Sequence, residues 1–385
     1  MTTTVPLIYS FPEFLGVADA VADHVISAQN QTLYNSTDLS QIELIKKGAI
    51  SRPQILKTNS SLSIINNNNN NNNSNNNNYN NNSNNGSGNT SNFQSTSQSR
   101  TSTPNHSPSH SSSHIQSSRS TSNLAAATSS SSTSTTTNGL KLKKEKKINK
   151  KQEIRFKIAI SGGSLIKILH QGLLPRQELI EWDKWDIYFA DERLVPFDSP
   201  DSNYGQAKRE IFDHIKGDKF PKIYHIDESL INDPQECAYE YEKQLVLSFA
   251  KKDSVKLPMF DLLLLGCAPD GHIASLFPNF GEQLREKFAW CMSVTDAPSG
   301  PKDRITLSIP VICHSARVTF VVEGLTKAPI IKTIIERPEK GLPSSIVNES
   351  AAGKVAWFVD DDALNDLYDI VKKKYKFLTI TDNEN

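Results

Sequence analysis

The stretch that decides the fold is FDLLLLGCAPDGHIASLFP, residues 260–278. Its first seven residues predict a strand that is apolar on both faces, as in a central parallel strand covered by helices on both sides. The strand then enters a turn that carries Asp270 and His272. Because ligands bind outside the carboxyl ends of strands in an open α/β sheet, this turn is a candidate site.

Strands and helices alternate on both sides of this stretch. IRFKIAI, WDIYFA, ITLSI, RVTFVVEG and KVAWFV predict strands, whereas SLIKILHQGLL, NYGQAKREIFDHI, PQECAYEYEKQLVLSFAK and TKAPIIKTIIER predict helices. Further helices are expected at residues 11–28, more weakly at 38–47, and from Asp361 to the C-terminus. The alternation predicts an α/β fold: an open, mostly parallel sheet with helices on both faces.

A low-complexity tract interrupts this pattern. Of the 385 residues 37% are apolar, but residues 58–152 contain only 13 apolar residues in 95, which leaves 129 in the other 290. So few apolar residues cannot repay the entropy of folding, and a disordered Asn/Ser/Thr-rich and Lys-rich insertion is expected there. Residues 1–57 and 153–380 would then form one domain, since a long surface loop costs little. The alternative is that residues 1–57 form a separate module, but a single amphipathic helix has no partner of its own.

The charges divide in the same way. The chain has 42 Lys+Arg and 42 Asp+Glu, yet the tract holds seven Lys, two Arg and one Glu, so +8 there is balanced by −8 elsewhere. No apolar run approaches the ~18–20 residues that cross a bilayer, and the N-terminus lacks the basic start of a signal peptide. The four cysteines are dispersed without a C-x-x-C pair, so neither a disulfide framework nor a zinc site is indicated. A cytoplasmic protein with free thiols is expected.

The turn after IAI is the second candidate. Ser161, Gly162, Gly163 and Ser164 follow this strand and open a helix. Free amides at a helix N-terminus attract phosphate. An ordinary βα loop with Ser164 as the helix cap would give the same pattern.

The third candidate is Asp191-Glu192-Arg193, directly after WDIYFA. Arg193 offers a planar fork that suits phosphate. The alternative is an internal ion pair between Arg193 and one of the two acids.

His272 is the natural general base at such a strand end, because a neutral imidazole accepts a proton near pH 7. Asp270, two residues earlier, could orient the ring or raise its basicity. The alternative is a purely structural histidine. Two further cations qualify: Arg304 opens ITLSI, and Lys327 lies in the first turn of a helix, where it opposes the helix dipole and so favours an anionic ligand nearby. A solvent-facing Lys327 is the alternative.

Together these motifs resemble the 6-phosphogluconolactonase family. The matching segments are SGGS, DERLVPFDSPDSNYG, DLLLLGCAPDGHIASLFP, RITLSIPVI, EGLTKAPIIKTII, LPSSIV and KVAWFVD, in the family's order. The resemblance implies the fold of the sugar-phosphate isomerase and deaminase superfamily. It also implies hydrolysis of 6-phospho-D-glucono-1,5-lactone to 6-phosphogluconate, in the oxidative pentose phosphate pathway, without metal or cofactor.

The resemblance also implies roles for the candidate residues. His272 would activate water and then protonate the leaving ring oxygen, supported by Asp270. The phosphate would bind Arg193 and Lys327, aided by the turn Ser161–Ser164, with Arg304 as a weaker candidate. Cys267 occupies a variable position of the family's turn and is not expected to be a nucleophile.

Two departures from the family pattern concern substrate contacts. Leu165-Ile166 stands where the family usually has Thr-Pro, and Ala268 replaces a glycine. A glucosamine-6-phosphate deaminase is the nearest alternative, but that family has Phe-Asn-Glu-Pro where this chain has SLFP at 275–278.

A non-catalytic sugar-phosphate-binding protein is a second alternative, and the presence of both Asp270 and His272 disfavours it. The expected partner is a small sugar-phosphate lactone, with no nucleic acid or membrane, and the expected state is a monomer. The tract is interpreted as a spacer; a nuclear-import or polyanion-binding patch and a self-associating segment are the alternatives.

Overall fold

The computed structural model describes residues 6–53, 55–58, 61–64, 153–250 and 255–378. Most of the tract expected at 58–152 lies outside the described residues. Its expected first residue, Thr58, ends the strand β2 (Ile55–Thr58), which pairs with β3 (Ser61–Ile64) as an antiparallel hairpin. The division of the chain at residues 57 and 153 stays a prediction.

The centre of the fold is a seven-stranded sheet in which every neighbouring pair is parallel. In sheet order the strands are β1 (Leu7–Phe11), β12 (Val355–Asp360), β11 (Val318–Val322), β8 (Leu262–Leu265), β4 (Phe156–Ile160), β5 (Trp185–Phe189) and β7 (Lys222–Tyr224). The stretch FDLLLLG supplies β8, the middle strand. The predicted mostly parallel sheet is confirmed.

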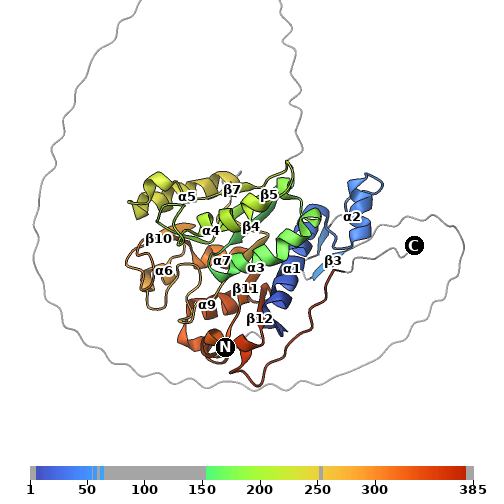
Figure 1. The fold of residues 1–385 in the computed structure, drawn as a ribbon. Helices are drawn as coiled ribbons and strands as arrows, with labels where there is room; N and C mark the ends of the chain where they lie inside the picture. Colours follow the sequence, from blue (N-terminus) through green and yellow to red (C-terminus); the bar gives the residue numbers. More distant parts are fainter. Residues whose placement is uncertain (1–5, 54, 59–60, 65–152, 251–254, 379–385) are drawn as a thin grey trace, which may run out of the picture. The chain divides into compact units, whose positions relative to one another are not determined.

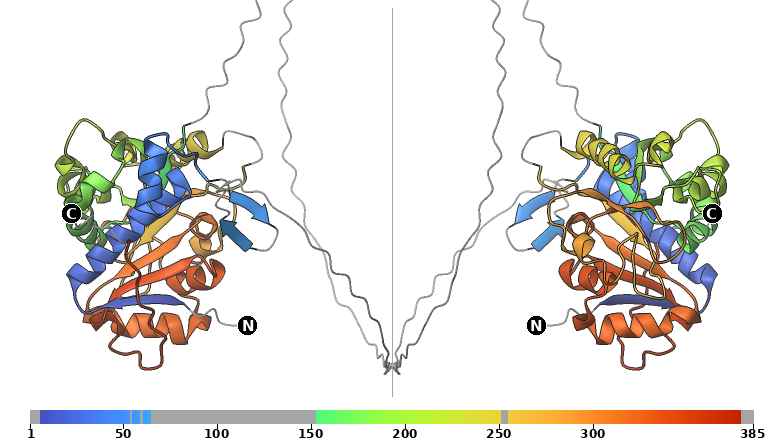
Figure 2. Two further views of the ribbon diagram at one scale, coloured as in Figure 1. Left: turned by 90° about the vertical axis from the view of Figure 1, so that its right-hand side faces the viewer. Right: turned by 90° about the vertical axis from the view of Figure 1, so that its left-hand side faces the viewer.

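Helices cover both faces of this sheet (Figures 1 and 2). One face carries α1 (Phe14–Tyr34), α3 (Ser164–Leu173) and α4 (Asn203–Glu210), and the other carries α5 (Pro234–Phe249), α7 (Ile309–His314), α8 (Ala328–Glu336) and α9 (Pro343–Ser350). Alternate residues of β8 enter the two cores: Leu262 and Leu264 the first, Leu263 and Leu265 the second. All four are fully buried, which explains why this strand is apolar on both faces.

A second, three-stranded antiparallel sheet lies beyond the carboxyl end of β5. Its order is β6 (Asp191–Arg193), β10 (Arg304–Leu307), β9 (Cys291–Val294). The expected strand ITLSI therefore belongs to this small sheet and not to the main one. The short helix α6 (Gly281–Arg285) precedes β9.

The N-terminal residues are part of the main sheet. The helix expected at 11–28 is α1, which begins at Phe14 and continues to Tyr34, and the weaker helix is α2 (Leu39–Lys46). The strand β1 before α1 was not expected; it pairs with β12 at the edge of the sheet. Helix α1 packs closely on α3, where a Cβ on Gly172 would lie 2.4 Å from the carbonyl oxygen of Ala18.

The prediction of a C-terminal helix from Asp361 is wrong. Between β12 and Leu378, the last described residue, the only helical element is the 3₁₀ turn Asp362–Leu364, and the chain then runs along the free edge of β1, where Lys373 N–H donates to Ile8 O at 2.8 Å. The Tyr375 ring packs 5.2 Å from the Tyr9 ring, and its hydroxyl donates to Asp23 Oδ2 at 3.0 Å. The unpaired backbone of an edge strand and an aromatic anchor thus outweigh the helical pattern of the sequence.

No helix in the described ranges is long and apolar enough to cross a membrane.

Candidate active site

The order of the strands places the site. The chain runs from β4 outward through β5 to β7, then returns to the other side of β4 as β8 and continues through β11 to β12. Strands are thus added on one side of β4 first and on its other side afterwards, so the order of the strands reverses between the parallel neighbours β4 and β8. Ligands bind at the carboxyl ends of strands at such a switch point. These two strand ends carry the turn Ser161–Ser164 and the turn with Asp270 and His272.

His272 carries a neutral, oriented imidazole. Asp270 Oδ1 lies 2.7 Å from His272 Nδ1 and also accepts the His272 backbone N–H at 3.1 Å. Because a carboxylate only accepts, Nδ1 carries the ring proton and Nε2 is left as the acceptor. Burial lowers the pKa of His272, and the negative charge of Asp270 offsets part of that shift. The imidazole is therefore unprotonated at neutral pH.

The backbone of this turn adopts a conformation that few residues tolerate. Gly271 has φ +85° and Ala274 has φ +48°, both in the left-handed region. The Gly271 carbonyl accepts a hydrogen bond from Ser344 Oγ at 3.0 Å, and the His272 ring packs 4.5 Å from the Phe277 ring. The imidazole thus stands on a tightly held loop.

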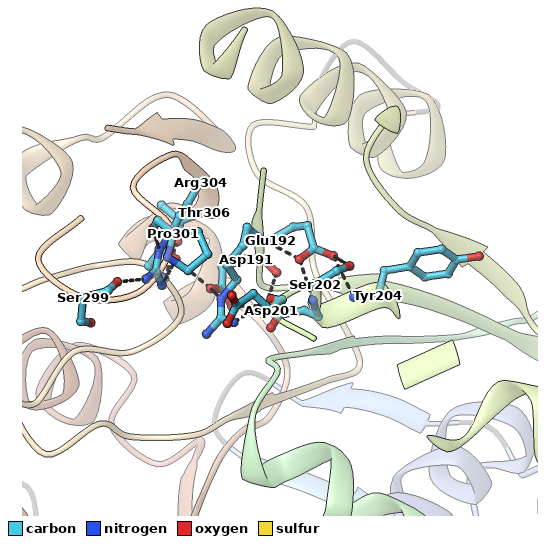
Figure 3. Close-up of polar contacts among 12 residues, drawn as sticks. Asp191, Glu192, Asp201, Ser202, Tyr204, Ser299, Pro301, Arg304 and Thr306 are labelled. Atoms are coloured by element: carbon cyan, nitrogen blue, oxygen red, sulfur yellow. Dashed lines mark hydrogen bonds and ion pairs between the residues drawn. The ribbon is translucent and has the colours of Figure 1, made fainter. Parts of the chain in front are cut away.

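Glu192 holds the first turn of α4 in place. Its carboxylate is buried and accepts the backbone N–H groups of Asn203 and Tyr204 at 2.7 Å each, at the first turn of α4. Figure 3 shows Glu192 turned toward Ser202 and Tyr204, away from Arg304. Burial raises the pKa of Glu192 to about 7. It anchors α4 and makes no ion pair with Arg193.

Asp191 lies on the other side of the same strand. It is only 3% exposed, and it accepts hydrogen bonds from Ser275 Oγ at 2.7 Å and Asn203 Nδ2 at 3.3 Å. Arg193 Nε is 3.9 Å from Asp191 Oδ2, so the ion pair considered for this segment exists at long range. Arg193 also donates to the Asp201 carbonyl at 2.8 Å.

Arg304 is brought opposite Arg193 by the pairing of β6 with β10. It is 2% exposed and donates to the carbonyls of Pro301, at 2.9 Å, and Ser299 (Figure 3). Burial and the nearby Arg193 lower the pKa of Arg304, yet a guanidinium keeps its charge at any physiological pH. Two guanidinium groups thus lie close together, with the carboxylates of Asp191 and Asp201 near them.

The first loop needs its glycines. A Cβ on Gly162 would lie 1.8 Å from Asn203 Oδ1, and Gly163 has φ +71° and caps α3. The N-cap is therefore Gly163, and Ser164 is the first residue of the helix. Ser161 is buried, and its Oγ has no hydrogen-bond partner among the described residues.

Lys327 ends the 3₁₀ turn Leu325–Lys327 and directly precedes α8. Burial lowers its pKa, whereas the neighbouring Cys267, Asp270 and Glu323 raise it. Lys327 thus lies on the Asp270 side of His272, whereas Arg193 and Arg304 lie with Asp191. No contact within the described ranges joins Lys327 to Arg193.

Comparison with known proteins gives the family. Residues 128–357 match the family described as glucosamine-6-phosphate isomerases/6-phosphogluconolactonase. The chain belongs to this family. A Saccharomyces cerevisiae relative named 6-phosphogluconolactonase-like protein 1 is 55% identical over 387 positions, covering 100% of this chain and 99% of that protein.

One further relative and one solved structure are also similar to this chain. A Schizosaccharomyces pombe protein named probable 6-phosphogluconolactonase is 49% identical over 212 residues, covering 54% of this chain and 82% of its own. The solved structure titled devB protein is 29% identical, with a TM-score of 0.50, over 57% of this chain and 90% of its own.

This member of the glucosamine-6-phosphate isomerase/6-phosphogluconolactonase family shows no metal-binding cluster in its described part, where no three His, Cys, Asp or Glu side chains gather suitably. Cys267 is buried, and burial raises its pKa to about 12, so it is no nucleophile at neutral pH. Asn203 and Ser275 were not foreseen from the sequence as part of the site. Both stand inside motifs quoted above, but only the fold shows that they meet Asp191.

A cavity of about 770 Å³ lies at the opposite, amino ends of β4, β5 and β8. Its buried charges satisfy one another: Arg155 Nε donates to Asp186 Oδ1 at 2.7 Å, and its other nitrogens donate to backbone carbonyls. In this family member we therefore assign the site to the carboxyl ends.

Proposed function

We propose that this chain hydrolyses 6-phospho-D-glucono-1,5-lactone to 6-phosphogluconate, the lactonase step of the oxidative pentose phosphate pathway. The observation that carries the proposal is the His272–Asp270 pair beside the buried Asp191–Arg304 cluster at the switch point of the sheet. The printed names of the relatives, 6-phosphogluconolactonase-like protein 1 and probable 6-phosphogluconolactonase, agree with it.

The reaction needs one group that first accepts a proton from water and later donates it to the leaving ring oxygen. His272 Nε2 takes a proton from water as the water oxygen bonds to the lactone carbonyl carbon, and the carbonyl oxygen becomes an oxyanion. When the oxyanion collapses, the bond from this carbon to the ring oxygen breaks. The imidazolium returns its proton to that oxygen, which leaves as a hydroxyl group. Asp270 stabilises the imidazolium and fixes the tautomer through Nδ1.

The phosphate of the substrate requires fixed cations. We assign it to Arg193 and Lys327, together with the amides of the turn Ser161–Ser164, because these groups follow the carboxyl ends of β5, β11 and β4, on either side of β8 and its His272 loop. Arg304 is a weaker candidate, since carbonyls and Ser275 already accept several of its N–H groups. We also propose that the enzyme is monomeric and cytoplasmic, that it uses no cofactor, and that it binds neither nucleic acid nor membrane.

A direct assay separates this function from its alternatives. The purified full-length chain is given the lactone, and its rate is compared with spontaneous lactone opening; a parallel sample is given glucosamine 6-phosphate and followed for ammonia. We expect lactone hydrolysis above the spontaneous rate without added metal, and no ammonia. Ammonia release without lactone hydrolysis would assign a deaminase, and neither activity would assign a binding protein.

A further inference from the structure

A single hydroxyl ties the loop of His272 to the small sheet. Ser275 is fully buried, three residues after His272. Its Oγ donates to Asp191 Oδ2 at 2.7 Å, and Arg304 Nη1 lies 3.4 Å from the same Oγ. The Ser275 backbone N–H donates to Thr306 Oγ1 at 3.3 Å. The loop is thereby fastened to β6 and β10.

Asp191 is itself fixed from two directions. Asn203 Nδ2 donates to the Asp191 carbonyl at 2.9 Å and to Oδ1 at 3.3 Å, whereas Ser275 holds Oδ2. A buried carboxylate is costly unless it is paired and hydrogen-bonded. The side chain therefore provides a negative charge at a fixed position near His272.

The backbone between these ties is strained. Ala274 has φ +48°, a left-handed conformation that is unfavourable for a residue with a Cβ. Such a conformation persists only where neighbours hold it on both sides. Ser344 holds Gly271 on one side, and Asp191 holds Ser275 on the other. Loss of the hydrogen bond between Ser275 and Asp191 would let the loop relax and shift the imidazole of His272.

We propose that Ser275 and Asp191 are positioning residues for His272. Ser275 fixes the loop so that Nε2 faces the bound carbonyl, and Asp191 supplies a charge that favours the imidazolium formed when water loses its proton. The inference rests on the proposed function, in which His272 is the base.

The charged groups that face His272 come from three elements. Asp270 lies on its own loop, Asp191 on β6 and Arg304 on β10; Lys327, before α8, faces Asp270. The two carboxylates favour the protonated ring, and Arg304 opposes them. Removing the charge of Asp191 should therefore make the imidazole harder to protonate.

Two variants separate the effect of the Ser275–Asp191 hydrogen bond from the effect of the negative charge on Asp191. Ser275→Ala cuts the tie and keeps the carboxylate, whereas Asp191→Asn keeps the shape and removes the charge. We measure kcat, KM, the pH dependence of kcat/KM, and the pKa of the His272 ring by NMR. Ser275→Ala should lower kcat by ~10–100-fold, as misplacement of a catalytic group does, with little change in that pKa. Asp191→Asn should lower the pKa of the His272 ring and move the acid limb of the profile with it, because a nearby negative charge that favours the protonated ring is lost.

Ser315→Ala is the matched control. It removes another fully buried hydroxyl, which donates to the Val311 carbonyl at 3.3 Å after α7, and should leave kcat and the His272 pKa unchanged. The inference is overturned if Ser275→Ala keeps kcat within twofold and Asp191→Asn leaves the ring pKa unchanged. Should Ser275→Ala not fold, Asp191→Asn alone decides by the same pKa criterion. A wild-type chain without lactonase activity would refute the proposed function, and the NMR comparison would still decide whether Asp191 acts on His272.

Discussion

At the residue scale, the site depends on charges held at fixed distances. Asp270 fixes the tautomer of His272 at 2.7 Å, and β-pairing sets Arg304 opposite Arg193. Fixed groups of this kind stabilise developing charge without reorganising during the reaction. The carboxyl ends of the strands thus hold cations and carboxylates at fixed positions close to one another.

Arg193→Ala should chiefly raise KM for the lactone, by about tenfold or more, because a charge-assisted bond to phosphate contributes ~1.5–3 kcal/mol. Steady-state kinetics measure it. Arg209→Ala is the control, since Arg209 donates to the carbonyls of Phe197 and Ser199 in the neighbouring loop. An unchanged KM in Arg193→Ala would remove this residue from the phosphate site.

Stability toward acid should depend on His24. Burial lowers the pKa of His24 to about 4, and its Nε2 lies 2.9 Å from Thr319 Oγ1. The unfolded chain takes up the proton near pH 6.5, so the stability is complete above that pH and is lost as the pH falls toward 4. Between pH 7 and 5 the wild type should lose about 2 kcal/mol more unfolding free energy than His24→Gln, measured by urea titration. Equal losses in both proteins would contradict this.

At the element scale, short segments that leave the main sheet build the site. β6 departs from the end of β5 to join β10, and this detour carries Asp191 and Arg193 to the loop of His272. The strand could not be foreseen, because three consecutive charged residues do not resemble a strand. In the C-terminal segment the sequence pattern is misleading in the opposite way. The pattern predicts a helix, but the open edge of β1 holds the segment extended.

The C-terminal segment should stabilise the fold through Tyr375. Tyr375→Ala removes packing on Tyr9 and the hydrogen bond to Asp23, and should lower the unfolding free energy by about 1–3 kcal/mol. Tyr368→Ala, at an 83% exposed position, is the control and should cost under about 0.5 kcal/mol. Chemical denaturation compares them, and equal losses would show that the segment is not anchored.

At the scale of the whole molecule, the sequence predicts the parallel sheet because β8, β4, β5, β11 and β12 are long apolar runs with helices between them. It also singles out His272 and Asp270, since they are neighbours in the chain. Contacts between distant segments are not visible in the sequence. Arg304 meets Arg193, and Ser275 meets Asp191, only because two strands pair beyond the main sheet.

The proposed division of the chain can be tested by deletion. Replacing residues 58–152 with a short Gly/Ser linker should leave the lactonase rate and the melting temperature near those of the full chain, because β1 and α1 still pack on β12 and α3. Solubility, melting and the lactone assay measure this. An insoluble or inactive product would show that the tract is needed by the fold.

The most direct test of the account compares His272→Ala with the wild type in the lactone assay, after subtraction of spontaneous opening. The account predicts a kcat lower by ~10²–10⁴-fold with an unchanged melting temperature, the usual effect of removing a general base. It also predicts that the acid limb of the wild-type kcat/KM profile lies below the ~6.5 of a free imidazole, since burial lowers the pKa of His272. Wild-type-like turnover by His272→Ala would contradict the central claim.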